Sequence, residues 1–185
     1  PEVYLGKTDA AAVTARINKT MEQYVSDGIF AEYRNALIYV ERTQRDGLVR
    51  CGIVGSVDLD AYDYCEGATS RVRATEKTVL ERIPPRVEIR KNASLELPHI
   101  LMLMDDTARA IVEPLAEHAK SGATQKLYDF DVMLDGGHLR GYLIPEDLHR
   151  EICQKIESLG ELHGGITLAV GDGNHSLATA KACRA

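Results

Sequence analysis

The sequence lacks an excess of basic residues, closely paired cysteines and any long apolar run. It has 22 Lys and Arg against 28 Asp and Glu, a formal net charge of -6, whereas nucleic-acid-binding domains usually carry a basic surface. No apolar run approaches the roughly 18 residues that a membrane span needs, and no signal peptide is visible. We therefore expect a cytoplasmic protein that has neither a nucleic-acid nor a membrane partner.

The four cysteines also lack the spacing of a metal or redox motif. No CxxC pair occurs among Cys51, Cys65, Cys153 and Cys183, so neither a zinc ribbon nor a thioredoxin-type site is indicated. In the expected compartment these thiols stay reduced. Cys51 and Cys153 fall on apolar patterns, which predicts that both lie in the core.

Length and composition predict a folded chain with a real core. The 185 residues are 44% hydrophobic, which suits one or two domains. The chain starts at Pro1 and ends at Ala185 inside an expected helix. We therefore expect residues 1–185 to form one domain or a fragment of a longer chain. The same chain is also compatible with assembly into a homo-oligomer. A subdivision into residues 1–95, with a helix and a hairpin, and residues 96–185, with the glycine motifs, is the alternative.

The first half of the chain shows a helix and a hairpin. An apolar stripe at 3.6-residue spacing predicts an amphipathic helix over residues 9–27, which Gly28 ends. Two β-rich runs flank Asp46-Gly47, a strong hairpin signal. Residues 62–86 predict a long loop and a short helix, and Pro84-Pro85 should stop any helix there.

The second half alternates strands and helices. Residues Pro98–Met104 predict a buried strand that ends in Asp105-Asp106, whose carboxylates could hold Mg²⁺ or could simply mark the exit of the strand. Further predicted elements are a helix at 114–120, strands around Gly136-Gly137, a helix over 146–159, a strand over 166–170 and a helix from about Ser176. We predict an α/β fold of the mixed α+β kind, in which helices flank a mixed sheet.

The clearest chemical signal is Gly171–His175, which we name the closing turn. A strand, a Gly-x-Gly turn at Gly171 and Gly173, and then a helix would expose backbone N–H groups at a positive helix end. This arrangement suits a phosphate or a carboxylate. It is neither a P-loop nor the dinucleotide GxGxxG motif. The alternative is an ordinary turn in which Asn174 or Ser176 caps the helix.

Each side chain of this stretch has a conceivable role. Asp172 could orient a metal or a hydroxyl, and His175 could donate to a phosphate or transfer a proton. Asn174 and Ser176 could contact the anion, while the two glycines let it approach the backbone. Asp172 and His175 are therefore the candidate catalytic residues.

Two other stretches could contribute to the same site. His138 and Arg140, beside a glycine-rich turn, could hold an anionic ligand, or could be solvated residues of a hairpin. Arg73 and Glu76 could serve phosphate binding or acid–base chemistry, or could belong to a solvated helix face. No metal-ligand spacing links the histidines.

Several blocks together resemble one protein family. The chain is similar to the domain-of-unknown-function family 1015 of bacteria and archaea in "IYVERTQRDGLVRCGIVGSVDLDAYDY", "RATEKTVLERIPPR", "LELPHILMLMDD", "IVEPL", "LYDFDVML", "GGHLRGYLI" and "GDGNHSLATAKA". The resemblance covers nearly the whole chain and implies that members extend beyond it at both ends.

This resemblance also implies a phosphate site. Many family members carry Asp-Gly-His-His-Arg at the closing turn, which is similar to the phosphate-holding Gly-x-His-Arg motif of the ParB/sulfiredoxin superfamily. That superfamily implies a ParB/sulfiredoxin-like strand, glycine turn and helix here, with Asp172, Gly173, Asn174 and His175 at the motif. This chain departs from the motif at Asn174 and at Ser176, which replaces an arginine, a principal phosphate ligand. Arg140 or Lys181 could substitute for it.

The resulting hypothesis is a domain that binds a nucleotide, with Mg²⁺, or another small anionic metabolite. Small-molecule phosphotransfer is the reaction it predicts, because phosphoryl transfer needs mainly positioning and charge neutralisation. A non-catalytic module that binds such a metabolite is the first alternative. A metal-dependent hydrolase using Asp172, His175 and His138 is the second.

Overall fold

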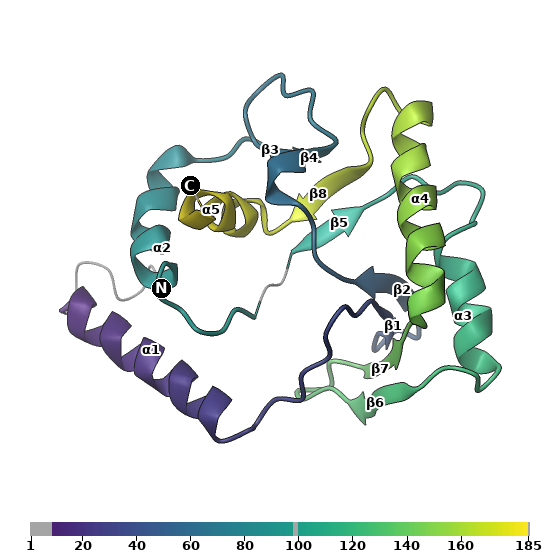
Figure 1. Ribbon diagram of the computed structural model, residues 1–185, viewed down its shortest axis with the longest axis horizontal. Helices are drawn as coiled ribbons and strands as arrows, with labels where there is room; N and C mark the ends of the chain where they lie inside the picture. The colour runs from purple at the N-terminus through teal and green to yellow at the C-terminus, as the bar shows by residue number, and fades with distance from the viewer. Residues whose placement is uncertain (1–8, 98–99, 185) are drawn as a thin grey trace. The chain divides into compact units, whose positions relative to one another are not determined.

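The computed structural model describes residues 9–97 and 100–184 and has a mixed α+β fold (Figure 1). Its contacts divide the chain into two compact units, each built from segments that are distant in sequence. Unit 1 comprises Pro1–Glu32, Asp58–Leu103 and Leu168–Ala185, and unit 2 comprises Tyr33–Val57 and Met104–Thr167. None of the helices within the described ranges is both long and apolar enough to cross a bilayer.

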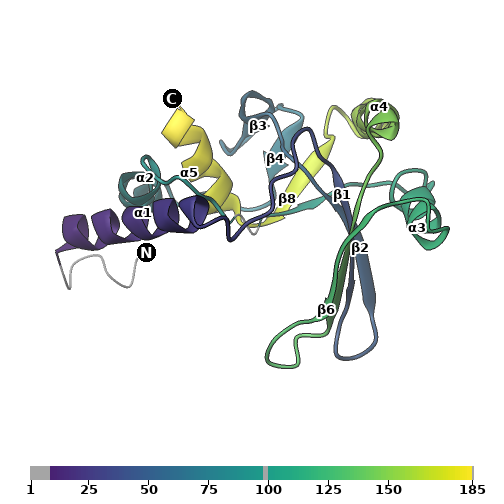
Figure 2. The ribbon, with the colours of Figure 1, turned by 60° about the horizontal axis from the view of Figure 1, so that its bottom comes forward.

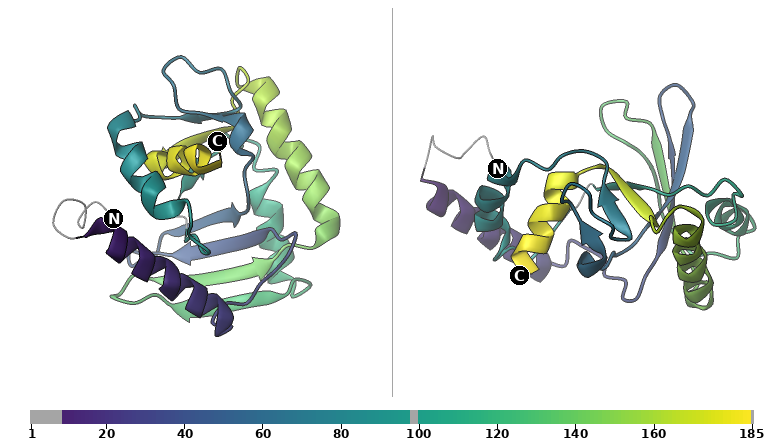
Figure 3. Two further views of the ribbon diagram at one scale, coloured as in Figure 1. Left: turned by 60° about the vertical axis from the view of Figure 1, so that its left-hand side comes forward. Right: turned by 90° about the horizontal axis from the view of Figure 1, so that it is seen from above.

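Unit 1 combines a small mixed sheet with three α-helices (Figures 1 and 3). The sheet has the strand order β3-β4-β8-β5, in which β3, β4 and β8 are parallel and β5 is antiparallel to β8. Its elements are α1 (Ala10–Ser26), η1 (Leu59–Ala61), β3 (Tyr62–Asp63), β4 (Val72–Ala74), η2 (Leu80–Arg82), α2 (Ile83–Arg90), β5 (Leu101–Leu103), β8 (Leu168–Asp172) and α5 (Asn174–Arg184).

The predicted first helix is confirmed, together with its two boundaries. The Asp9 carboxylate accepts hydrogen bonds from the backbone N–H groups of Ala11 (3.1 Å) and Ala12 (3.2 Å), as an N-cap side chain does. Gly28 follows the helix with φ of 65°, a conformation that glycine adopts without steric cost.

Two expectations in unit 1 are wrong. Pro84 and Pro85 do not stop a helix but lie in the first turn of α2, where the missing N–H groups would have had no partner within the helix. The strand expected over Pro98–Met104 is neither as long nor as buried, because β5 lies at the edge of its sheet. Leu101 and Leu103 are 50% and 53% exposed, and Pro98 lies outside the described residues.

Unit 2 is an antiparallel sheet packed against two helices (Figure 2). The strand order is β2-β1-β7-β6, and every neighbouring pair is antiparallel. Both predicted hairpins are present, and the helix predicted over residues 146–159 is present as α4. The elements are β1 (Ile38–Thr43), β2 (Val49–Val54), α3 (Val112–Lys120), β6 (Lys126–Asp131), β7 (His138–Leu143) and α4 (Glu146–Leu162).

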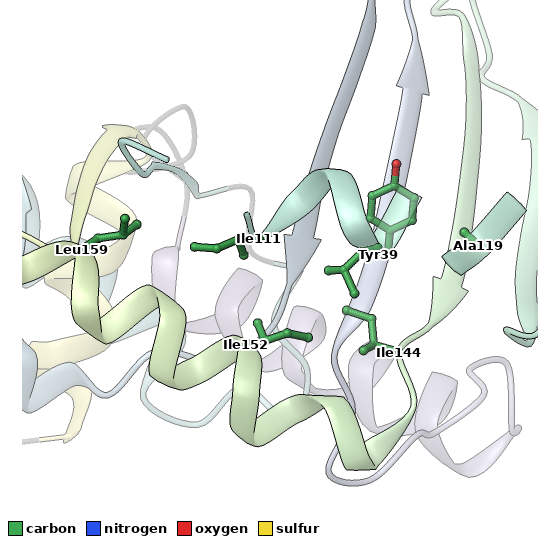
Figure 4. Packing of buried hydrophobic residues seen from close by; sticks show 7 residues of the cluster. Tyr39, Ile111, Ala119, Ile144, Ile152 and Leu159 are labelled. Atoms are coloured by element: carbon green, nitrogen blue, oxygen red, sulfur yellow. The ribbon is translucent and has the colours of Figure 1, made fainter. Parts of the chain in front are cut away.

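The core of unit 2 lies between the sheet and these helices (Figure 4). Tyr39 of β1 packs with Ile152 of α4 and with Ile144, which follows β7. Cys51 and Cys153 are exposed, which corrects their expected place in the core. Cys51 lies on the edge strand β2, and Cys153 falls beside the apolar stripe of α4 instead of on it.

One glycine in unit 2 fixes the position of a hairpin turn. Gly137 has φ of 93°, and a Cβ atom there would collide with the carbonyl oxygen of Thr43 on the neighbouring strand. The turn between β6 and β7 therefore needs glycine both for its backbone conformation and for the close approach to β1.

Candidate functional site

The closing turn is tighter than the sequence predicted. Strand β8 continues to Asp172 and helix α5 begins at Asn174 (Figure 1), so Gly173 alone connects them. Its φ of 83° makes the sharp change of direction possible. A Cβ atom at Gly171 would approach the Leu103 side chain to 3.1 Å, so this glycine allows close packing of β5.

The first turn of α5 leaves backbone donors open. The Gly173 N–H donates to the Asp172 carboxylate at 2.7 Å, and the first helical bond runs from the Leu177 N–H to the Gly173 carbonyl at 3.0 Å. Within the described ranges, the N–H groups of His175 and Ser176 have no acceptor. Such donors, together with the helix dipole, favour an anion.

Asn174 has a structural role at this position. It is 1% exposed, and its Nδ2 donates to the Thr78 hydroxyl at 2.6 Å and to the Glu76 carbonyl at 3.2 Å. Its Oδ1 accepts from the Tyr62 hydroxyl. Burial is the main reason why the pKa of Tyr62 is raised. The hydroxyl therefore keeps its proton and acts as a donor. The Asn174 side chain therefore fixes the segment after β4 to the start of α5.

His175 presents only one ring nitrogen to a ligand. Its Nε2 lies 3.0 Å from the backbone N–H of Val79 and accepts from it, which assigns the proton of the neutral ring to Nδ1. The side chain is half-buried. Nδ1–H is thus the group that could donate to a phosphate oxygen.

Ser176 accepts hydrogen bonds from an arginine that no sequence pattern indicated. Arg90, on helix α2 beside α5 (Figure 3), donates to the Ser176 carbonyl at 2.6 Å and to its hydroxyl at 3.3 Å. Glu96 forms an ion pair with this guanidinium, with 2.7 Å between Arg90 Nη2 and Glu96 Oε2. Arg90 lies 86 residues from Ser176 in sequence, so no local pattern indicates the contact. Lys181, named as a substitute for the missing arginine, donates to the Tyr62 carbonyl.

Arg73 and Glu76 lie on the chain segment next to the closing turn. Arg73 donates to the carbonyl groups of Ser70 at 2.6 Å and Thr69 at 3.0 Å, so part of its guanidinium holds the local loop. Glu76 contributes its backbone carbonyl to Asn174, while its side chain is exposed. The ligand-binding roles of both side chains stay predictions.

His138 and Arg140 lie on β7 and therefore in unit 2. The His138 ring contacts Asp131 at 2.7 Å and Asp129 at 2.5 Å, and these two hydrogen bonds raise its pKa. Arg140 lies 3.4 Å from Asp129 and 3.8 Å from Glu41. Carboxylates thus offset both cations. A joint site with the closing turn, which belongs to unit 1, stays a prediction.

The carboxylates after β5 are part of the fold. Asp106 accepts from the N–H groups of Ala110 at 3.1 Å and Ile111 at 2.8 Å and so holds the loop that precedes α3. Asp105 lies 3.6 Å from His163. Residues 9–97 and 100–184 contain no cluster of three His, Cys, Asp or Glu side chains that could hold a metal ion.

Comparison with known proteins shows the family. The model of the family described as "Protein of unknown function (DUF1015)" matches residues 1–185, so the chain belongs to this family, as the sequence blocks indicated. No curated protein and no solved structure matches the chain.

Proposed function

We propose that this member of the DUF1015 family binds a phosphate group at the closing turn. The phosphate would belong to a nucleotide with Mg²⁺ or to another small phosphorylated metabolite. The observation that carries the proposal is that the N–H groups of His175 and Ser176 have no acceptor, while the Nε2 bond of His175 leaves its Nδ1–H for a ligand. Three donors at a helix N-terminus suit the oxygens of one phosphate.

Asp172 is the reason for including Mg²⁺. Its carboxylate is exposed and lies at the same helix end, where it already accepts from Gly173. A negative side chain beside a phosphate site opposes the ligand unless a cation lies between them. Mg²⁺ commonly bridges one or two carboxylates and substrate phosphates. Asp172 therefore supports a ligand that arrives as a magnesium complex.

Phosphotransfer is the reaction that this equipment would serve. The helix end would neutralise charge, Asp172 would orient the metal, and His175 would donate a hydrogen bond or a proton from Nδ1. The second candidate is a non-catalytic module that binds the same ligand. It is favoured by Ser176 in place of the motif arginine and by the neutralisation of Arg90 by Glu96, because both reduce the positive charge available for a transition state.

The test is a thermal-shift series with AMP, ADP, ATP and inorganic phosphate, each with and without Mg²⁺. We expect a selective rise in Tm with one magnesium nucleotide, since a ligand at 100 times its Kd stabilises the native state by about 2.7 kcal/mol. Asp172→Asn should abolish the magnesium dependence and improve binding of the metal-free ligand. Glu66→Gln, an exposed acid of the same unit, is the matched control and should leave both unchanged.

Turnover and binding separate the two candidates. In an enzyme, His175→Ala should abolish turnover and weaken binding only modestly, because the open N–H groups remain. In a binding module, the wild-type protein binds the nucleotide without converting it. If no phosphate compound raises the Tm of the wild-type protein under any of these conditions, the proposal is wrong.

A further inference from the structure

The unit 2 sheet has a second face, directed away from its core. Tyr39 of β1, Ile53 of β2 and Tyr142 of β7 pack on the core side, and side chains alternate between the two faces of a strand. The residues between them therefore lie on the opposite face, which we name the outer face. Its two central rows cross all four strands and are Tyr128–Gly141–Val40–Gly52 and Phe130–Leu139–Arg42–Arg50.

The acidic side chains of the four strands all lie on the side opposite the outer face. Arg42 and Arg50 are direct cross-strand partners, and the two rows contain no acidic residue. The carboxylates of Glu41, Asp129 and Asp131 alternate with these rows and face the other side, where His138 and Arg140 meet them.

The two arginines are available for an anion. In the described part of the chain Arg42 donates only to the Gly136 carbonyl, at 3.2 Å, and Arg50 has no ion pair. Like charges directly opposite each other on neighbouring strands are unfavourable. An anion between the guanidinium groups would remove that repulsion.

Two aromatic rings of β6 lie on the same face as the arginines. The Tyr128 ring covers Gly141, where any Cβ atom would collide with it. Phe130 is 48% exposed, and its ring centroid lies 6.0 Å from that of Tyr128 at an interplanar angle of 58°. Exposed rings on an open sheet are platforms on which unpaired bases stack.

The spacing of rings and cations matches a chain of nucleotides. Phe130 lies two strands from Arg42 and three from Arg50, which is about 10 Å and 14 Å at the usual strand separation of about 4.8 Å. A base on Phe130 would place its backbone within reach of the long arginine side chains. We propose that the outer face binds single-stranded nucleic acid, with bases on the rings and phosphates on Arg42 and Arg50.

This proposal departs from the expectation that the net charge of -6 supported. Net charge averages over the whole surface, whereas the acids of this sheet lie on its other face. The remaining negative charge predicts weak binding that salt readily reduces. Lipid headgroups would satisfy the arginines but would leave the rings without a stacking partner, so nucleic acid fits both features.

Fluorescence anisotropy with labelled ten-nucleotide dT, rU and duplex probes at low ionic strength tests the proposal. We expect single strands to bind more tightly than the duplex, with a salt slope of about -1.4 for two phosphates at roughly -0.7 each. Arg42→Gln and Arg50→Gln should each reduce that slope by about half. Phe130→Leu, which keeps apolar bulk, should weaken binding about tenfold through lost stacking. Arg150→Gln, on helix α4, is the charge-matched control and should change nothing.

The outcomes separate this site from the closing turn. Asp172→Asn should leave oligonucleotide binding unchanged, and Arg42→Gln should leave the magnesium-nucleotide shift unchanged. The proposal is wrong if the single strands do not bind at low salt, or if binding survives in the Arg42→Gln/Arg50→Gln double variant with its circular dichroism intact. Arg42-dependent binding to anionic phospholipid vesicles without oligonucleotide binding would also overturn it.

Discussion

The Asn174→Ala substitution should destabilise unit 1 strongly. The wild-type side chain is 1% exposed and makes hydrogen bonds with Tyr62, Thr78 and the Glu76 carbonyl. Alanine would leave the hydroxyls of Tyr62 and Thr78, which are 0% and 5% exposed, without this partner. An unsatisfied buried polar group costs about 1–3 kcal/mol, so we expect a loss of about 3 kcal/mol in the free energy of unfolding.

Urea denaturation followed by circular dichroism measures this loss. With an m-value of about 2 kcal/mol/M, the midpoint should fall by about 1.5 M. Asn92→Ala, an exposed asparagine of the same unit, should change stability by less than about 0.5 kcal/mol. Hydrogen exchange of the α5 amides identifies unit 1 as the part that is weakened.

A double-mutant cycle isolates the contact between Asn174 and Tyr62. Tyr62→Phe removes the donor and should cost about 1–2 kcal/mol. Because both substitutions break the same hydrogen bond, the double variant should be more stable than the sum of the single effects predicts, by about 1 kcal/mol. Full additivity, or a loss below about 0.5 kcal/mol for Asn174→Ala, would refute the buried network as the link that joins β3 and the segment after β4 to α5.

Two predictions concern unit 2. Ile152→Ala, at a position 5% exposed, should cost about 2–5 kcal/mol, whereas Leu162→Ala on the same helix, at a position 76% exposed, should cost little in the same urea assay. Asp131 and Asp129 raise the pKa of His138, so the stabilisation from these contacts is complete below the ordinary histidine pKa of about 6.5 and is lost as pH rises through the raised value. NMR titration of the His138 ring should show the raised pKa and its fall on Asp131→Asn; an ordinary pKa in the wild-type protein would contradict the ion pairs.

Local sequence patterns predicted most of the elements because their causes are local. The Gly28 stop and the Asp46-Gly47 turn each act within a few residues, and the structure confirms both. The pattern around Pro84-Pro85 was misread because the same residues end one helix or begin the next. Which of these occurs depends on what lies C-terminal to them.

Local sequence patterns predicted less of the candidate site than of the helices and strands. The sequence placed the closing turn between a strand and a helix, because glycine at Gly173 and the helix formers after it are local signals. It also named Asn174 as a ligand contact, whereas the structure directs that side chain into a buried network with Tyr62 and Thr78. The partners come from β3 and from the segment after β4, about 100 residues away.

The sequence by itself determined the family, the mixed α+β class and the glycine turn, since short-range periodicity and turn chemistry suffice for the last two. Tertiary structure alone decided that distant segments interleave into two units, that Arg90 reaches Ser176, and that the arginines of the β1–β2 hairpin share a face with two aromatic rings. These outcomes depend on strand order and pairing register. Both are set by long-range packing that no window of the chain contains.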